Sequence, residues 1–446
     1  MSPLDVYERP ADPAGPAAAG DRTPTAVQRR RVGAASLIGT TIEWYDYFVF
    51  GSAAALVFGQ LFFPTVDPLT GTLASFATFA VGFIARPIGG IVMGHFGDRV
   101  GRKSMLVTSM MMMGVATVLI GLLPTYETIG IAAPILLVLL RLIQGFGVGG
   151  EWGGAVLMAV EYAPPKRRAV FGALPQMGLP AGVILANLAF IFAAQEFAPE
   201  EFAQWGWRVP FLLSAVLIVV GLILRLKIEE SPEFAGVRER SEVEKAPIVE
   251  VVRSHFGNLV LASAASIAAP ALGYLILVYM LSYGVGVLGH APGTVLWVIV
   301  GASVAWLVAV GLAAVAAERF GRKRVFLAGA LLVAVWAFPF FALVDSGDLG
   351  AMSLAMTVAA VAVATMAGPQ AALVADLFPA RVRYSGASLA YQIGSVLGGA
   401  FAPSIATSLF AARHESWPIA LYMAGLGVIS FGALLFLRAD TPELAR

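Results

Sequence analysis

Twelve apolar stretches, each long enough to cross a lipid bilayer as a helix, follow one another along this chain of 446 residues. A helix needs about 20 mostly apolar residues to span the hydrocarbon core. Only 13% of the residues are charged, against about 25% in soluble globular proteins. The sequence therefore predicts an all-α membrane protein with twelve transmembrane helices. These lie near residues 33–61, 72–95, 104–123, 134–160, 168–194, 208–226, 256–284, 292–316, 324–344, 352–375, 384–411 and 417–437.

The basic residues predict how the helices are oriented. All 29 lysines and arginines except Arg86, Arg141, Arg208 and Arg413 fall in the tails or in connections on one side. Cytoplasmic loops carry such an excess. We therefore expect both termini in the cytoplasm and an uncleaved first helix, because no short apolar leader precedes it.

Several classes of function are excluded by composition. The chain has no cysteine, and its four histidines show no metal-ligand spacing. A net charge of +1 gives no reason to propose nucleic acid as a partner. The sequence contains neither a nucleotide-binding loop of the Walker A type nor a hydrolase triad. We therefore predict no enzyme activity, no metal and no cofactor.

An internal repeat divides the stretches into two sets of six. The acid-Arg-x-Gly-Arg-Lys pattern of residues 98–103 recurs at residues 318–323, and Glu161 and Asp376 follow the fourth and tenth stretches in the same register. Such duplication predicts two pseudo-symmetric six-helix bundles. The expected organisation is a disordered tail at 1–31, bundles at 32–226 and 256–437 joined by a cytoplasmic linker at 227–255, and a short tail at 438–446.

The loop at 94–103, Gly-x-x-x-Asp-Arg-x-Gly-Arg-Lys, resembles the signature loop of the major facilitator superfamily. Residues 43–47, 86–90, 141–154 and 207–211 resemble its metabolite:proton symporter branch, and within it the shikimate-transporter-like members. The resemblance covers about residues 32–437. It implies the major facilitator fold, alternating access and a multi-pass location in the bacterial inner membrane.

The resemblance also implies two gates. In the first, Asp98 would cap the start of the eleventh span, while Arg102, beside Arg99, would pair with Glu161. The second copy would act in the same way against the fifth span, through Glu318, Arg322 and Asp376. The alternative is that these charges serve only as topology signals.

Five charged residues lie inside the predicted spans, where a charge costs about 3 kcal/mol or more unless it is paired or hydrated. Helix rise places Glu43, Arg86 and Glu151 about 15 Å from the cytoplasmic ends, and Asp46 and Arg141 about 20 Å. We expect two layers of opposite charges facing one central cavity.

Three carboxylates against two guanidiniums leave one carboxylate in excess, and arginine stays charged. A surplus acid in such a site is a candidate proton carrier. The predicted proton-coupling residues are Glu43, Asp46 and Arg141, with Arg141 as the partner that releases the proton; the resemblance also links the Arg-x-x-Gln-Gly pattern at 141–145 to proton coupling. The alternative is a fully paired structural network that never titrates.

Two arginines in a cavity suggest an anionic or zwitterionic solute, because guanidinium binds carboxylate in a bidentate manner. The second half contributes only neutral polar groups, which predicts proton coupling by the first half and substrate shaping by the second. The predicted substrate-binding residues are Arg86, Arg141, Glu151, Gln144, Tyr47, Gln176, Tyr274, Tyr391 and Gln392.

The main hypothesis is a secondary active transporter that imports a small organic acid with protons, with the lipid bilayer as its other partner and no requirement beyond a monomer. The alternatives are a proton-coupled exporter, a symporter of a betaine or proline, and a membrane sensor. Family antiporters carry a Gly-Pro motif in span five, and residues 176–182 depart from it. The short tail after residue 437 is unlike the coiled coil of the family's osmosensors.

Overall fold

The computed structural model describes residues 26–100, 102–149, 159–160, 163–164, 167–226, 247–379 and 382–437. All regular elements within these ranges are helices, which confirms the predicted all-α class. The predicted tails and most of the linker at 227–255 lie outside the described residues, except that α1 begins at Ala26 and that α12 (Pro247–Ser254) forms a helix at the end of the linker.

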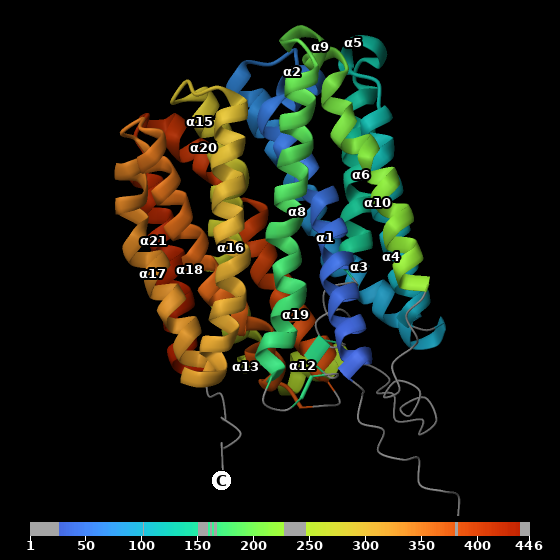
Figure 1. Cartoon of the computed structure of the whole chain (residues 1–446), viewed down its shortest axis with the longest axis vertical. Helices are drawn as coiled ribbons and strands as arrows, with labels where there is room; N and C mark the ends of the chain where they lie inside the picture. Colours follow the sequence, from blue (N-terminus) through green and yellow to red (C-terminus); the bar gives the residue numbers. More distant parts are fainter. Residues whose placement is uncertain are drawn as a thin grey trace, which may run out of the picture.

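The first half contains six long helices. They are α1 (Ala26–Leu56), α3 (Pro68–Val100), α4 (Arg102–Leu122), α6 (Ala132–Gly149), α8 (Arg168–Glu196) and α10 (Val209–Leu226). Four short elements lie at the upper end in Figure 1, namely α2 (Phe58–Phe62), α5 (Tyr126–Ile129), α9 (Pro199–Gln204) and η2 (Gly206–Arg208).

The second half also has six membrane-length elements, two of them interrupted by π-helical turns. The seventh is built from α13 (Phe256–Ala265), α14 (Ala268–Tyr274), η3 (Leu275–Tyr279) and α15 (Met280–Gly286). The eleventh joins α19 (Arg383–Ser395), η4 (Val396–Ala400) and α20 (Ala402–Arg413). The others are α16 (Pro292–Phe320), α17 (Arg322–Val344), α18 (Leu349–Asp376) and α21 (Trp417–Phe436).

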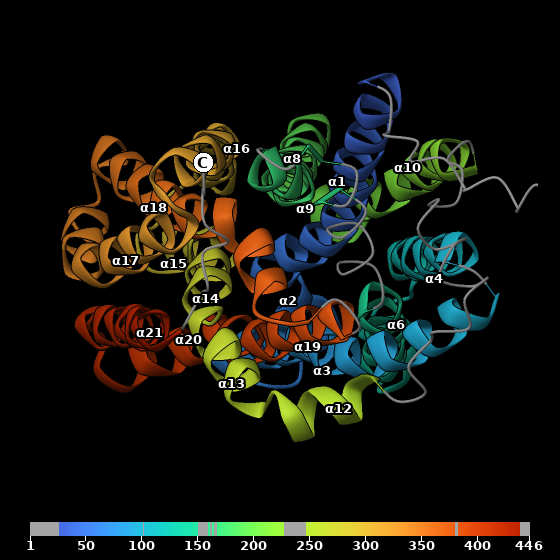
Figure 2. The ribbon, with the colours of Figure 1, turned by 90° about the horizontal axis from the view of Figure 1, so that it is seen from below.

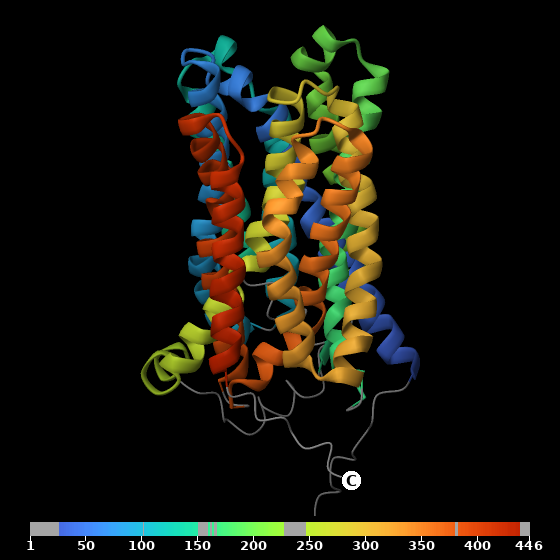
Figure 3. The ribbon, with the colours of Figure 1, turned by 90° about the vertical axis from the view of Figure 1, so that its left-hand side faces the viewer.

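The two halves stand side by side with their helices nearly parallel (Figure 1). Seen from below, the first-half helices lie to the right and the second-half helices to the left, and α12 lies across the lower end (Figure 2). Helix α8 packs against α1 in its own half and against α16 and α18 in the other half. Figure 3 shows the long helices spanning the full height of the bundle.

The outer surface of the bundle is apolar. Ten helices of the described residues are long and apolar enough to cross a membrane. With α1 and the shorter apolar run Val107–Leu122 in α4, they make up the twelve predicted spans. Large apolar side chains face outward along these helices; examples are Leu312, Val335 and Phe436. The chain is therefore a multi-pass membrane protein.

Glycines allow α3 and α6 to pack backbone against backbone. A Cβ atom on Gly145 would lie 1.9 Å from the Gly82 carbonyl oxygen, and one on Gly89 would lie 1.9 Å from that of Phe146. Small residues of this kind let membrane helices approach closely. The contact brings Arg86 of α3 and Arg141 of α6 together at mid-height, with the Arg141 side chain lying over Gly82.

The glycine of the second loop motif has a conformational role. Gly321 has φ 96° and separates α16 from α17 by a single residue. Residues with a side chain rarely adopt this conformation. The tight turn places Glu318 and Arg322 together at the lower end of the bundle.

Candidate functional site

Two buried arginines enclose one tyrosine ring. The Cζ atoms of Arg86 and Arg141 lie 4.4 Å and 4.1 Å from the centroid of the Tyr47 ring. Arg86 also lies against Phe83 and Trp44, and Arg141 against Phe50 and Phe79. Aromatic faces attract a guanidinium by cation–π interaction, so the rings hold both charges without neutralising them.

The guanidinium pair has more donors than acceptors. The Nε and Nη2 atoms of Arg86 and of Arg141 have no hydrogen-bond partner among the described residues. Glu43, which is buried, interacts electrostatically with Arg86. An unmade hydrogen bond to a buried donor costs about 1–3 kcal/mol, and more for a charged group. The pair is therefore suited to binding an anion.

The carboxylate of Asp46 does not meet Arg141 directly. Ser214 of α10 donates a hydrogen bond to Asp46 Oδ1, and Oδ2 has no donor among the described residues. Arg141 Nη1 instead donates to Gln144 Oε1 at 2.9 Å, and Gln144 Nε2 donates to the Thr117 hydroxyl at 2.7 Å. Two neutral side chains therefore separate the predicted proton carrier from its predicted partner.

This arrangement corrects one expectation. Asp46 points toward α4 and α10, where its Oδ2 would lie 3.6 Å from a Cβ atom on Gly114. The expected two layers of opposite charges around one central cavity are therefore wrong for Asp46. Helical spacing placed Glu43 and Asp46 on a common face, but the packing of α4 and α10 against α1 gives them different neighbours.

A small cavity lies between the two halves, next to the arginine pair. Its volume is about 40 Å³, and its aromatic wall consists of Trp44, Phe48, Tyr274, Trp306 and Tyr391. Ligand pockets usually measure about 300 Å³ or more. In this structure the two halves therefore close around a contracted cavity.

Amide and indole groups supply the polar part of the cavity wall. Gln176 Nε2 donates to Gln370 Oε1 at 3.4 Å, which joins α8 of the first half to α18 of the second. Gln370 Nε2 and Trp306 Nε1 are buried without an acceptor among the described residues. Both unsatisfied groups are donors, so the cavity favours a ligand rich in oxygen acceptors.

The structure divides the predicted substrate-binding residues into three groups. Gln176, Tyr274 and Tyr391 line the cavity. The side chains of Arg86, Arg141, Tyr47 and Gln144 are buried beside it, and Gln392 Nε2 donates to the Gly149 carbonyl of the first half at 3.3 Å. Glu151 lies outside the described residues. Sequence reasoning missed Trp306, since a lone tryptophan in an apolar span carries no signal, and it did not assign Trp44 of the 43–47 motif to the cavity.

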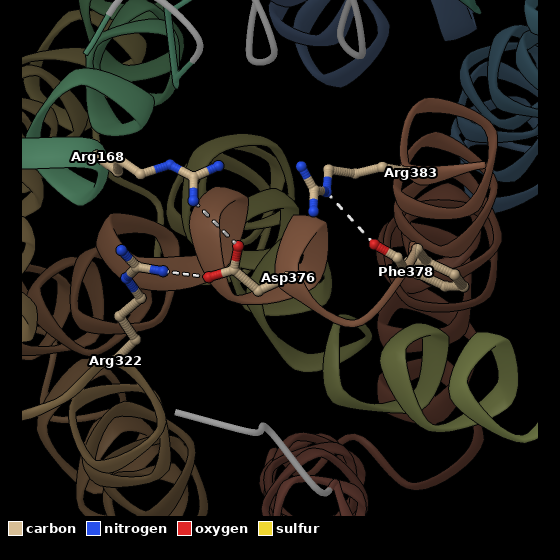
Figure 4. Close-up of polar contacts among 5 residues, drawn as sticks. All are labelled: Arg168, Arg322, Asp376, Phe378 and Arg383. Carbon is tan, nitrogen blue, oxygen red and sulfur yellow. Dashed lines mark hydrogen bonds and ion pairs between the residues drawn. The ribbon is translucent and has the colours of Figure 1, made fainter. Parts of the chain in front are cut away.

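The predicted gate residues of the second loop meet at the lower end of the bundle. Asp376, the last residue of α18, forms ion pairs with Arg322 and, at 3.5 Å, with Arg168 of α8 (Figure 4). Glu318 Oε1 accepts a hydrogen bond from the Val170 backbone N–H at 3.1 Å. That N–H lies in the first turn of α8, where the helix dipole favours an anion.

Two of these contacts, Arg168–Asp376 and Val170–Glu318, therefore join the second half to α8. The Arg322–Asp376 ion pair holds Asp376 in position for the first of them. Arg383 adds a hydrogen bond within the second half, from its Nε to the Phe378 carbonyl (Figure 4). In the first loop, the side chains of Asp98, Arg99 and Arg102 lie outside the described residues, as does all of Glu161.

The fold and the site together define a class, that of multi-pass membrane transporters built from two halves. The families that the chain matches agree with this class. Residues 32–255 match the family described as "Sugar (and other) transporter", and residues 287–446 match the Major Facilitator Superfamily. The chain belongs to the major facilitator superfamily, a family of transporters and not of enzymes.

Relatives of the chain are metabolite transporters. The inner membrane metabolite transport protein YhjE of Escherichia coli is 42% identical and the shikimate transporter of the same organism is 40% identical. Both alignments cover 91% of this chain, and 93% and 94% of the relative. The Escherichia coli proline/betaine transporter is 33% identical over 90% of this chain and 81% of its own.

Among solved structures, the proton:xylose symporter XylE superposes with a TM-score of 0.73, covering 92% of this chain and 95% of its own at 19% identity. This likeness confirms the twelve-helix major facilitator fold. The sequence resemblance to this superfamily, and to its metabolite transporters, is therefore confirmed.

Proposed function

We propose that this protein imports a small carboxylate metabolite together with protons by alternating access. The observation that carries the proposal is a buried acid, Asp46, separated only by Thr117 and Gln144 from a buried arginine that has free donors and lies next to the cavity. The arginine pair supplies an anion site, and Asp46 and Glu43 supply proton carriers. The name of the shikimate transporter, a close relative, supports the carboxylate class.

The second candidate is a symporter of a zwitterion. Relatives named proline/betaine transporter favour it, and an aromatic wall of the kind found here also binds quaternary ammonium groups. The unsatisfied donors of Gln370 and Trp306 argue for a ligand with oxygen atoms at that end. We therefore place the carboxylate first and test both.

The orientation proposed for the chain puts the lower end of Figure 1, with the Arg168–Asp376 contact, in the cytoplasm of a bacterium. Because the chain has no native cysteine, Asp67→Cys and Arg319→Cys each create a single thiol. An impermeant maleimide added to intact cells should label the first and spare the second. The reverse pattern would invert the proposed topology.

The test of function uses purified protein in liposomes that contain a pH-sensitive dye. Shikimate, aromatic acids, proline and glycine betaine are added outside in turn, and the lumen should acidify with a carboxylate. Asp46→Asn and Glu43→Gln should reduce the signal, and Asp67→Asn, which changes an exposed acid outside the spans, should not. Uptake of radiolabelled solute without acidification would leave a uniporter and refute proton coupling.

A further inference from the structure

The hydrogen bonds that link Arg141 to Gln144 and Gln144 to Thr117 can be donated in only one direction. Arg141 is a donor only, so the Gln144 oxygen must face it and the Gln144 amide NH₂ must face Thr117. A hydroxyl has one proton and two lone pairs. Gln144 occupies one lone pair of Thr117, which leaves one lone pair and one proton to be used elsewhere.

That single proton has two possible acceptors. In the structure, Thr117 Oγ1 donates to the Met113 carbonyl one turn earlier at 2.9 Å. The same hydroxyl faces the Asp46 carboxylate closely enough for the two to interact, and Asp46 Oδ2 has no donor among the described residues. Thr117, Gln144 and Asp46 are each at most 1% exposed, so water does not compete for these positions.

We propose that Thr117 is the hydroxyl switch that links the protonation of Asp46 to Arg141. When Asp46 is protonated, its O–H donates to the free lone pair of Thr117, and the Thr117 proton stays on the Met113 carbonyl. When Asp46 loses the proton, the Thr117 hydroxyl rotates and donates to the carboxylate. In the structure the Thr117 hydroxyl donates to the Met113 carbonyl, as the protonated arrangement requires. This inference rests on the proposed proton coupling.

The neighbours of Asp46 favour such a switch. Of the described residues, Glu43 and Tyr45 on the same helix are the titratable groups that interact with it electrostatically. Helices α4 and α10 face Asp46 with Gly114, Thr117 and Ser214, which carry no charge. Because no basic group from these helices neutralises it, hydroxyl donors are the means by which its ionised form is stabilised.

Removing the hydroxyl has a predictable sign. A hydrogen bond to an ionised group is roughly twice as strong as one between neutral groups. The Thr117 hydroxyl therefore stabilises the ionised form of Asp46 more than the protonated form. In Thr117→Val, the midpoint for protonation of Asp46 should therefore move to a pH higher by about one unit.

The experiment needs no transported solute. Infrared difference spectra of the purified full-length protein are recorded against pH, and the carbonyl band of protonated Asp46 is assigned as the band that Asp46→Asn removes. In Thr117→Val, and in the smaller Thr117→Ala in case the first does not fold, the band should move to higher pH. Thr117→Ser should restore the wild-type midpoint. Thr78→Val is the matched control, because Thr78 is buried and donates only to the Ser75 carbonyl.

The outcomes separate the two proposals. If Asp46→Asn removes a band whose pH midpoint is the same in Thr117→Val and Thr117→Ala as in the wild type, the result overturns the switch but not proton coupling. The absence of any band removed by Asp46→Asn overturns both the switch and the role of Asp46 as proton carrier. A shift in the Thr117 variants that Thr117→Ser reverses, with Thr78→Val unchanged, establishes the switch.

Discussion

The Arg168 guanidinium and the Asp376 carboxylate lie 3.5 Å apart and belong to opposite halves of the protein. Arg168 begins α8, whereas Asp376 ends α18 and is held from its other side by Arg322 of its own half. One carboxylate thus joins the halves at the lower end, and its position is fixed by a second arginine. If this contact is part of a gate, its loss must favour opening at that end.

Asp376→Asn should therefore increase access to the interior from the lower end. Ala371 is buried between the halves, with Val160 and Tyr391 as neighbours, and Ala371→Cys gives a single reporter thiol. Partly exposed ion pairs contribute about 0.2–1 kcal/mol each, so the maleimide labelling rate should rise about two- to fivefold. Asp345→Asn, an acid of the same half that bonds Tyr283 and Ser416 instead, is the control. Equal labelling rates in the two variants would indicate that the Arg168–Asp376 pair is only a topology signal.

The close contact of α3 and α6 predicts an intolerance to a single methyl group. Gly89→Ala should lower the melting temperature in detergent, because its Cβ atom would lie 1.9 Å from a backbone oxygen and overpacking costs about 1–3 kcal/mol. Gly311→Ala, also in a long helix, meets nothing within 4 Å and should melt like the wild type. Melting temperatures that agree for the two variants would contradict the described packing.

The arginine pair predicts that charge alone is insufficient at position 141. Arg141 stacks on Tyr47 and donates to Gln144 at once, and lysine cannot do both. Arg141→Lys should reduce, by about tenfold or more, the uptake of a radiolabelled solute that the wild type accumulates, as expected for the loss of a charged hydrogen bond. Arg208→Lys changes an arginine that stacks on Trp207 away from the cavity and should retain uptake. Full uptake by Arg141→Lys would argue against planar recognition of a carboxylate.

The fold was predictable from the sequence because the bilayer permits few alternatives. Apolar length predicted the spans, and the repeated loop predicted two halves. Of the second loop, Glu318 bonds α8 directly, whereas Arg322 pairs with Asp376, which in turn pairs with Arg168 of α8.

The arrangement around Asp46 could not be predicted in the same way. Counting charges considered only the five ionisable residues and ignored the neutral Gln144 and Thr117 that separate Asp46 from Arg141. Whether a residue of α1 faces the cavity or α10 depends on how α1 is rotated about its own axis. Helical spacing alone does not determine that rotation. Trp306 was missed because its role arises only when α16 closes on α1 and α18.

The measurement that tests the central claim most directly compares net uptake with exchange in Asp46→Asn liposomes, using a solute that the wild type accumulates. Net uptake under an inward proton gradient requires a proton to bind and leave, whereas exchange of labelled for unlabelled solute does not. The account predicts that Asp46→Asn loses accumulation and keeps exchange. If Asp46→Asn accumulates solute as the wild type does, Asp46 is not the proton carrier and the proposed link from Asp46 to Arg141 is wrong.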